Sequence, residues 1–499
     1  MTRSGTFWLI TLAILLVILL LSSAVQKSFW EDETLTAHTA AGGLERISQL
    51  AKRDMHPPLM YIVASYWGRL FGYNELGLRS LSIIFAVLTL VFAYLFASEA
   101  FEQRTAIFAI ILLAISPLFI MYAHNARYYS FSAFLTILAV YAMYRFESSN
   151  RFIYLFVYIA ACTALLYLIF LSISVFLACN IWWFIQWWRK GSHKFSQVVY
   201  WLSAQAAVFV LFTVGSRYLL NAIQNYPNDI EFQNWLFDIL KRIAFFGYSF
   251  SVGETISPTN PIAWIGLLVV IGIAVFALWI NRKNINFWLL VIMVMLILIL
   301  NLVASFNARL ISTWQNISYR SLFALPFFLI WLGTGISKMR PNVGLVITFI
   351  LVLVHGVGLF NYFSNNQYIR PMFTVNWHEI FQNIYSNAQA DTVVICNRGD
   401  YSCFYYSQRY ELDTYRSNNW EDIKKDDPSE VWWVQTNLIR EIESEAQENT
   451  VFNNISKQYV QSETFNYAPQ DSSIRDFKSR FLNLREYEYR VNVIRFYNP

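Results

Sequence analysis

Between Arg151 and Arg189 the chain runs for 37 residues without a single charged side chain. One α-helix of that length would extend about 55 Å at 1.5 Å per residue. The hydrocarbon core of a bilayer is only about 30 Å thick and takes roughly 20 apolar residues to cross. The stretch therefore predicts a hairpin of two membrane-spanning helices, and it predicts that the whole chain is a membrane protein.

The composition agrees with a membrane protein. Of the 499 residues 56% are hydrophobic and 14% are charged, whereas soluble domains have about 25% charged residues. The net charge of +5 is small and no dense stripe of Lys and Arg occurs, which argues against nucleic acid as a partner.

Apolar runs predict about eleven transmembrane helices. We expect them near residues 7–25, 76–97, 105–122, 128–144, 152–169, 171–188, 195–216, 262–280, 286–304, 319–337 and 342–363. The first run is longer than the apolar region of a signal peptide and is followed by a poor cleavage site, so we interpret it as a retained helix.

Basic residues gather in alternate short loops, which is the positive-inside pattern. One set of loops contains Arg3, Arg104, Arg145, Arg151, Arg189, Lys190, Lys194, Arg282, Lys283, Lys338 and Arg340, and the opposite short loops contain only Arg127 and Arg309. We therefore expect a multi-pass protein of the cell (inner or plasma) membrane with its N-terminus in the cytoplasm. An odd number of spans then puts the C-terminal tail outside.

Three segments on the predicted outer side are long: 26–75, 217–261 and 364–499. Residues 59–71 are apolar but too short to span, and we expect a helix on the membrane surface. The tail predicts a small extracytoplasmic (periplasmic) α/β domain with a helix at 377–388 and strands at 391–397, 430–435 and 489–496. The predicted domains are thus 1–363, with outer loops 26–75 and 217–261, and 364–499.

The four cysteines give little information about the fold. Cys162 and Cys179 lie in apolar spans and are typical packing residues. Cys396 and Cys403 lie in the polar tail, and they are candidates for a disulfide if the tail occupies an oxidising compartment.

Polar groups at the predicted outer boundary are the candidate site. Glu31, Asp32 and Glu33 follow the first helix directly, and such a carboxylate suits a general base acting on a hydroxyl or amine. A solvated acidic loop is the alternative. Asp54 and His56 precede two prolines that fix the chain direction, for which a simple helix-entry turn is the alternative.

Arginines form a second group at the same boundary. Arg79, Arg127, Arg309 and Arg320 all lie near the predicted outer ends of spans. Cations on one side of a membrane suit a phosphate-binding site, although snorkelling to lipid headgroups explains each one singly. In the loop 247–258 Glu254 is either an additional acid or a plain loop carboxylate. The sequence lacks a Walker loop, a GxSxG elbow and metal-ligand spacing of His and Cys.

Taken in order, these motifs resemble the membrane glycosyltransferases of the GT-C fold, which include protein O-mannosyltransferases and the lipid A aminoarabinose transferase. The resemblance covers roughly residues 1–360 and involves the following segments: Asp32-Glu33-Thr34; the D-x-H-P-P-L-x-Y stretch at 54–61; Glu75 to Arg79; Ser116-Pro117; Asn125 to Ser130; and Tyr319 to Leu322 with Pro326. The chain departs from the family at Asn125, where many relatives have Glu, in the order Tyr319-Arg320, and in the absence of a His-Tyr pair after residue 166.

The resemblance implies transfer of a sugar from a polyprenyl-phosphate donor, by single displacement with inversion, to a hydroxyl or amine of a lipid, glycan or protein acceptor. It implies Asp32 as the base with Glu33 in support, and His56, Arg79, Arg127 and Arg320 at the donor phosphate, with Asp54, Tyr128 and Glu254 as supporting residues. Membrane lipids are a further expected partner. No cofactor is certain, and a divalent cation (Mg or Mn) stays open because carboxylates cluster. The alternative function is a transporter or flippase of an amphipathic lipid, although no internal repeat is visible.

Overall fold

The computed structural model describes residues 3–51, 57–190, 195–224, 235–305, 316–389, 391–396, 401–416, 428–436, 451–467 and 491–498. The chain divides into two compact units. The first comprises Met1–Ala24, Thr39–Ile256 and Asn260–Tyr362, and the second comprises Val25–His38, Ser257–Thr259 and Phe363–Pro499. Each unit is described separately.

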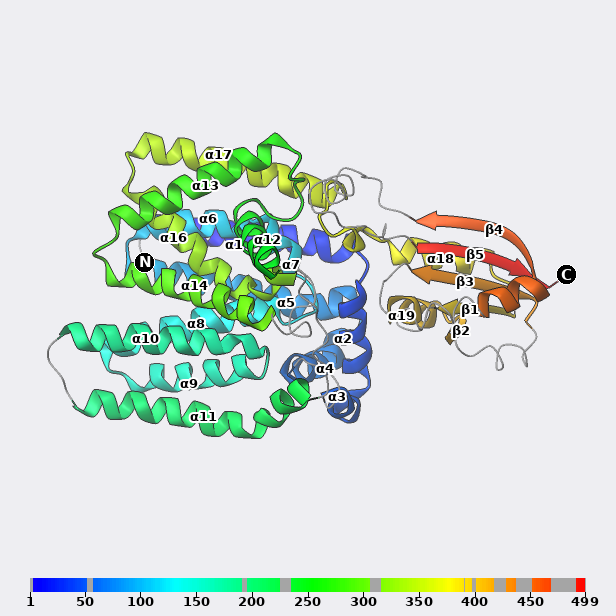
Figure 1. Ribbon diagram of the computed structural model, residues 1–499, viewed down its shortest axis with the longest axis horizontal. Helices are drawn as coiled ribbons and strands as arrows, with labels where there is room; N and C mark the ends of the chain where they lie inside the picture. The colour runs from blue at the N-terminus through cyan, green and yellow to red at the C-terminus, as the bar shows by residue number, and fades with distance from the viewer. Residues whose placement is uncertain are drawn as a thin grey trace. The chain divides into compact units, whose positions relative to one another are not determined.

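The first unit is built from helices (Figure 1). They are α1 (Arg3–Gln26), the last turn of α2 (Glu31–Ala41), α3 (Gly43–Ala51), α4 (Leu59–Phe71), α5 (Glu75–Ala100), α6 (Gln103–Ala114), α7 (Pro117–Ala123), α8 (Tyr129–Ser149), α9 (Phe152–Leu166), η1 (Phe170–Ser172), α10 (Ile173–Lys190), α11 (Phe195–Gln224), α12 (Trp235–Val252), α13 (Pro261–Ile280), α14 (Ile285–Ser305), α15 (Asn316–Arg320), η2 (Leu322–Ala324), α16 (Leu325–Lys338) and α17 (Pro341–Phe363).

The uncharged stretch forms the predicted hairpin. Helices α9 and α10 are separated by the short turn η1, and α9 also packs against α11. The predicted helix at 59–71 is confirmed as α4.

The predicted single helix 105–122 is wrong, because α6 and α7 meet at an angle of 61°. Ser116 adopts an extended conformation and its hydroxyl accepts a hydrogen bond from the backbone N–H of Phe119, while Pro117 occupies the first turn of α7. Proline cannot donate to the preceding turn and is favoured at a helix start. A new helix therefore begins at Pro117.

Two further predictions need correction. The helix expected at 319–337 is divided into α15, η2 and α16, with Pro326 in the first turn of α16. The segment 247–258 is not a loop throughout, because α12 continues to Val252. Phe246 and Phe250 stack on one face of that helix, and Gly253, with φ of +87°, follows its end.

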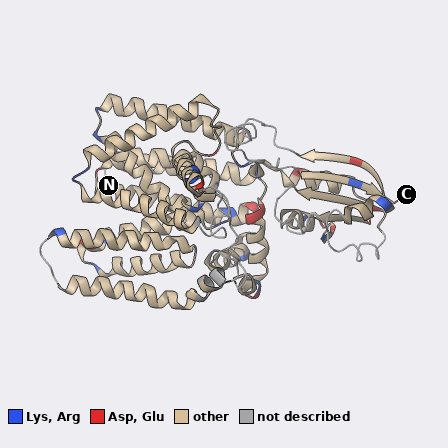
Figure 2. Ribbon diagram, in the orientation of Figure 1, with Lys and Arg blue, Asp and Glu red and all other residues tan. Residues whose placement is uncertain are grey.

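Seven helices among the described residues are long and apolar enough to cross a membrane, or eight if α6 and α7 form one bent span. Helices α9 and α16 are apolar but shorter. Few residues along these helices are coloured as Lys, Arg, Asp or Glu in Figure 2. The chain is a multi-pass helical membrane protein, and the number eleven stays a prediction.

The second unit carries a five-stranded sheet in the order β2-β1-β3-β5-β4. Besides the part of α2 up to His38, its elements are η3 (Pro371–Thr374), α18 (Trp377–Asn387), β1 (Thr392–Cys396), α19 (Tyr401–Arg409), β2 (Asp413–Arg416), β3 (Glu430–Thr436), β4 (Val460–Tyr467) and β5 (Val491–Tyr497). Strands β2, β1 and β3 are parallel, and β5 runs antiparallel to both β3 and β4. The predicted small α/β domain is confirmed.

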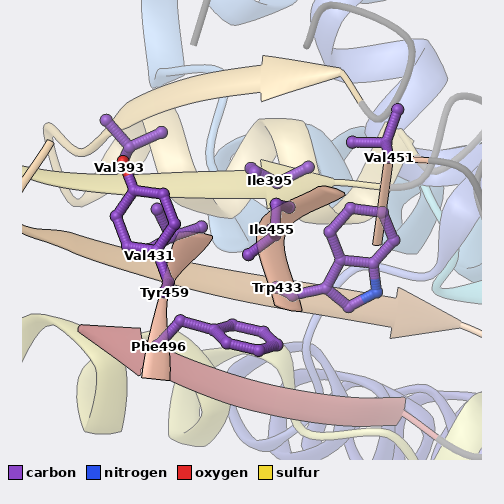
Figure 3. Packing of buried hydrophobic residues seen from close by; sticks show 8 residues of the cluster. All are labelled: Val393, Ile395, Val431, Trp433, Val451, Ile455, Tyr459 and Phe496. Atoms are coloured by element: carbon purple, nitrogen blue, oxygen red, sulfur yellow. The ribbon is translucent and has the colours of Figure 1, made fainter. Parts of the chain in front are cut away.

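One face of this sheet forms a compact apolar core. Figure 3 shows the cluster of buried side chains: Val393, Ile395, Val431, Trp433, Val451, Ile455, Tyr459 and Phe496. Successive side chains of a strand point to opposite faces, so Cys396 points to the other face. There it forms a disulfide with Cys403 of α19, a pairing that the sequence left open.

A buried ion pair links the strands of this sheet. Arg495 on β5 contacts the fully buried carboxylate of Glu430 on β3 at 2.5 Å, and Thr392 on β1 also donates to that carboxylate. The guanidinium of Arg495 lies over the rings of Trp432 and Tyr497. The carboxylate of Glu430 thus connects β3 to β5 through the ion pair and to β1 through the hydrogen bond from Thr392.

Candidate active site

The chain breaks its helical path again between α7 and α8, at residues 124–128. All five residues are buried. The backbone carbonyl of Asn125 accepts from the backbone N–H of Arg127 at 2.6 Å and from the Ser82 hydroxyl at 2.7 Å. The turn is thus fixed to the start of α5, and its irregular backbone is satisfied inside the protein, as lipid surroundings demand.

Arg127 lies in this turn and is 2% exposed. Its Nη1 donates to the hydroxyl of Tyr61 on α4 at 3.2 Å. Its guanidinium also lies 6.0 Å from the centre of the Tyr61 ring and 5.7 Å from the centre of the Tyr128 ring. Aromatic faces at this range stabilise a cation, so the protein holds a buried positive charge at the turn.

Arg320 ends α15, directly after Tyr319. The ring of Tyr319 packs edge-on against that of Tyr129 at 5.4 Å, and the ring of Tyr129 packs against that of Tyr128 at 4.8 Å. The Nε of Arg320 is buried and makes no hydrogen bond to the described part of the chain. One cluster of tyrosine rings thus connects the segments that carry Arg127 and Arg320.

Arg79 lies in the first turns of α5 and is 1% exposed. Its Nη1 donates to the backbone carbonyl of Ala24 at the end of α1, 3.1 Å away. Ser82, one turn later on α5, donates to the carbonyl of Asn125. Arg79 is thereby placed on the helix turn that supports the Arg127 segment.

Glu254 is fully buried just after α12. Its carboxylate accepts a hydrogen bond from the hydroxyl of Tyr122 at 2.7 Å and another from the hydroxyl of Ser318. Tyr122 also packs against the rings of Tyr129 and Tyr319. Glu254 therefore joins α7, the end of α12 and α15, and it is buried and hydrogen-bonded where a plain loop carboxylate would be exposed.

The acidic residues after the first span belong to the second unit. They form the first turn of α2, which opens in red in Figure 2, and a solvated loop is the wrong interpretation for them. Glu33 is fully buried and its Oε2 accepts from the backbone N–H of Trp30 at 3.3 Å, which is the glutamate half of a capping box. Asp32 is half-buried beside it. Acidic side chains in a first helical turn are stabilised by the helix dipole.

Three candidate residues lie outside the described residues: Asp54, His56 and Arg309. Of the other candidates, the first unit contains Arg79, Arg127, Tyr128, Glu254 and Arg320, and the second contains Asp32 and Glu33. Within the described ranges no group of three or more His, Cys, Asp and Glu side chains is arranged to hold a metal ion.

The structure adds three residues that sequence reasoning did not single out. Tyr61 contacts Arg127, and Tyr122 and Ser318 hold Glu254. Tyr61 ends the D-x-H-P-P-L-x-Y stretch, and Ser318 precedes the Tyr319-Arg320 pair. Their closeness to a motif was the available signal, but nothing in the sequence pairs them across helices.

Comparison with known proteins gives matches to part of the chain. Residues 55–216 match the family model of dolichyl-phosphate-mannose-protein mannosyltransferases, a range that includes Arg79 and Arg127. A 146-residue stretch is 32% identical to an uncharacterized protein of Aquifex aeolicus (strain VF5), and this alignment covers 28% of each chain. The chain thus spans about a quarter of the length of that curated relative.

Solved structures resemble almost the whole chain. ArnT from Cupriavidus metallidurans, bound to undecaprenyl phosphate, is 10% identical with a TM-score of 0.58, and the match covers 98% of both chains. The oligosaccharyltransferase AglB from Archaeoglobus fulgidus, in complex with an inhibitory peptide and a dolichol-phosphate, is also 10% identical with a TM-score of 0.51, and the match covers 94% of this chain and 73% of AglB. The chain is therefore a polytopic membrane protein with the GT-C fold, completed by a small C-terminal sheet domain.

Proposed function

We propose that this protein transfers a sugar from a polyprenyl-phosphate donor to a hydroxyl or amine of an acceptor, on the extracytoplasmic side of the cell membrane. The observation that carries the proposal is the buried guanidinium of Arg127, which lies near the rings of Tyr61 and Tyr128. Tyr128 also belongs to the cluster of tyrosine rings that ends at Tyr319, beside Arg320. An arginine among apolar helices costs about 3 kcal/mol or more. Such charges persist where they serve a function, and a lipid-linked phosphate is a suitable anion for them.

The leaving group of such a reaction is a phosphate. It needs cations that neutralise its charge and little help from a general acid. We assign this role to Arg127 and Arg320 with Arg79, and to His56. The solved structures similar to this chain include ArnT with undecaprenyl phosphate and AglB with a dolichol-phosphate, which supports a polyprenyl phosphate as the donor's carrier.

The acceptor must lose a proton as it attacks C1 of the sugar. We assign to Asp32 the role of the base that accepts this proton. Glu33 fixes the helix turn from which Asp32 projects. Asp54 and Glu254 are positioning residues in this proposal. Direct attack on the donor inverts the configuration at C1.

We infer the orientation of the protein in the membrane from the disulfide of the C-terminal domain and from the distribution of basic residues. A disulfide between Cys396 and Cys403 is typical of an oxidising compartment, so we assign the C-terminal domain (364–499) to the extracytoplasmic side. The positive-inside pattern then assigns the N-terminus of the transferase domain (1–363) to the cytoplasm.

A transfer assay tests the proposal. Purified protein is incubated with polyprenyl-phosphate sugars and membrane extract, alongside Arg127→Ala and a matched Arg145→Ala control. Arg145 pairs with Glu99 and Tyr154 and is not a candidate site residue. We expect Arg127→Ala to raise the apparent KM for donor about tenfold or more, because a charge-assisted hydrogen bond contributes roughly 1.5–3 kcal/mol.

Two outcomes contradict the proposal. If Arg145→Ala and Arg127→Ala impair donor use equally, the phosphate site is misassigned. If wild type consumes no donor while the same preparation moves lipid across liposome membranes, the protein is a lipid transporter.

A further inference from the structure

The acidic turn is anchored to the C-terminal helix α19 on its N-terminal side. The backbone N–H of Phe29 donates to the hydroxyl of Tyr406 at 2.6 Å, and both residues are fully buried. The ring of Phe29 also packs edge-on against Tyr405 at 5.5 Å. Because this N–H precedes the helix and has no helical carbonyl to bind, the Tyr406 hydroxyl supplies its acceptor.

A second contact lies on the other side of the acidic pair. The hydroxyls of Thr34 and Ser402 are 3.4 Å apart, and both residues are buried. Ser402 and Tyr406 are four residues apart on α19 and therefore share one face of that helix. One face of α19 thus holds the chain just before and just after Asp32 and Glu33.

Neighbouring elements of the same unit reinforce this attachment. Ser28 donates to Asn376 and accepts from the backbone N–H of His378, each at 3.2 Å. The ring of Trp30 lies 4.7 Å from that of Phe373. The segment that carries the acids is therefore packed as part of the C-terminal unit.

Helix α19 is itself fixed on both sides. The disulfide joins Cys403 to the end of β1, in the parallel part of the sheet. The ring of Tyr406 stacks on Trp377 of α18 and contacts His378 at 4.9 Å. The Tyr406 hydroxyl therefore projects from a rigid support, as a well-positioned catalytic group requires of its surroundings.

We propose that Tyr406 is a positioning residue that holds the acidic turn, so that the C-terminal domain orients the general base. This inference rests on the proposed function, in which Asp32 takes the acceptor proton. It assigns the tail a role in the chemistry, through α19 and its disulfide. A misplacement of about 1 Å at a reacting group lowers a rate by as much as about 100-fold, so loss of one anchoring hydroxyl has a measurable effect.

The test uses the full-length protein and compares Tyr406→Phe with Tyr467→Phe. Both variants lose one phenol hydroxyl in the same unit, but Tyr467 accepts from Asn383, away from the acidic segment. We expect Tyr406→Phe to lower kcat about tenfold with the donor KM unchanged, and to raise amide hydrogen exchange in the peptide 27–36. Tyr467→Phe should do neither.

The double variant Cys396→Ser/Cys403→Ser is the second arm. If the disulfide fixes α19, this variant should lower kcat and raise exchange in the same peptide, again with the donor KM unchanged. Thermal unfolding of each variant verifies that the fold is retained.

The outcomes separate the two levels of the proposal. If wild type transfers sugar and Tyr406→Phe keeps full kcat, the inference is wrong while the proposed function stands. If Tyr467→Phe lowers kcat as much as Tyr406→Phe does, the loss reflects the stability of the domain, and the inference is also wrong. If wild type transfers no sugar, the proposed function itself fails.

Discussion

The hydroxyl of Tyr122 donates a 2.7 Å hydrogen bond to the buried carboxylate of Glu254, and this contact joins the short helix α7 to the end of α12. A buried carboxylate is costly unless hydrogen bonds satisfy it. The hydroxyl of Ser318 is its second donor. The two hydrogen bonds therefore stabilise the place where α7, the end of α12 and α15 meet.

Removing the Tyr122 hydroxyl should weaken the first unit. We expect Tyr122→Phe to lower the free energy of unfolding by about 1–2 kcal/mol, because the buried acceptor loses a donor. Thermal unfolding of the detergent-solubilised protein measures the change. Tyr167→Phe is the control, since its hydroxyl bonds an exposed carbonyl, and an equal loss in that control would contradict the prediction.

Glycine at position 358 allows a close approach between helices. A Cβ there would lie 2.7 Å from Cγ of Pro117, whereas a Cβ at Gly356, in the same helix α17, would meet nothing within 4 Å. We expect Gly358→Ala to destabilise the protein by about 1–3 kcal/mol through overpacking. Gly356→Ala should be neutral or slightly stabilising, because alanine favours the helix.

Thermal unfolding of the two glycine variants, side by side, checks this prediction. Similar melting temperatures for both would show that Pro117 can move away, and that the bend between α6 and α7 is not fixed by this contact.

The ion pair of the C-terminal sheet offers a comparison around a single arginine. Glu430 is fully buried and Glu463 is 55% exposed, yet both contact Arg495. We expect Glu430→Ala to cost about 3–5 kcal/mol, because it removes the fully buried carboxylate that pairs with a guanidinium that is itself only 12% exposed. Glu463→Ala should cost less than about 1 kcal/mol, as exposed pairs do. Unfolding in denaturant measures both, and equal costs would contradict the assignment.

The proposed base is tested by an isosteric change. Asp32→Asn keeps the size of the side chain and removes its ability to accept a proton, so transfer should fall about 10²–10⁴-fold, the usual contribution of a general base. Glu45→Gln, at an exposed carboxylate of α3, is the control. A well-folded Asp32→Asn protein that transfers sugar at near wild-type rate would exclude Asp32 from this role.

Long apolar runs predicted most of the transmembrane architecture, because each span must be apolar over its whole length. The interruptions were harder to predict. Ser116 and Pro117 carry the signal of a helix start, but the hydrophobicity is continuous across them, and the break is visible only as an angle. Strand β4 was also unpredictable, since its first five residues are exposed and show no apolar alternation.

The candidate site was predictable as a set of residue types and only partly as a geometry. The arginines stood out because charges are rare in spans. In the structure a cluster of tyrosine rings connects the segments that carry Arg127 and Arg320, whereas sequence spacing cannot pair residues 193 positions apart. Glu33 was expected to support a base, and its side chain accepts a hydrogen bond from the backbone at the start of its own helix. The supporting role stays a prediction.

The state of the four cysteines has a practical consequence. Cys396 and Cys403 are joined, and Cys162 and Cys179 are buried among apolar helices. The native chain therefore offers a water-soluble maleimide no exposed thiol. A single cysteine introduced at an exposed loop becomes the reactive one, so sidedness can be mapped by labelling intact cells while the disulfide that supports α19 is left in place.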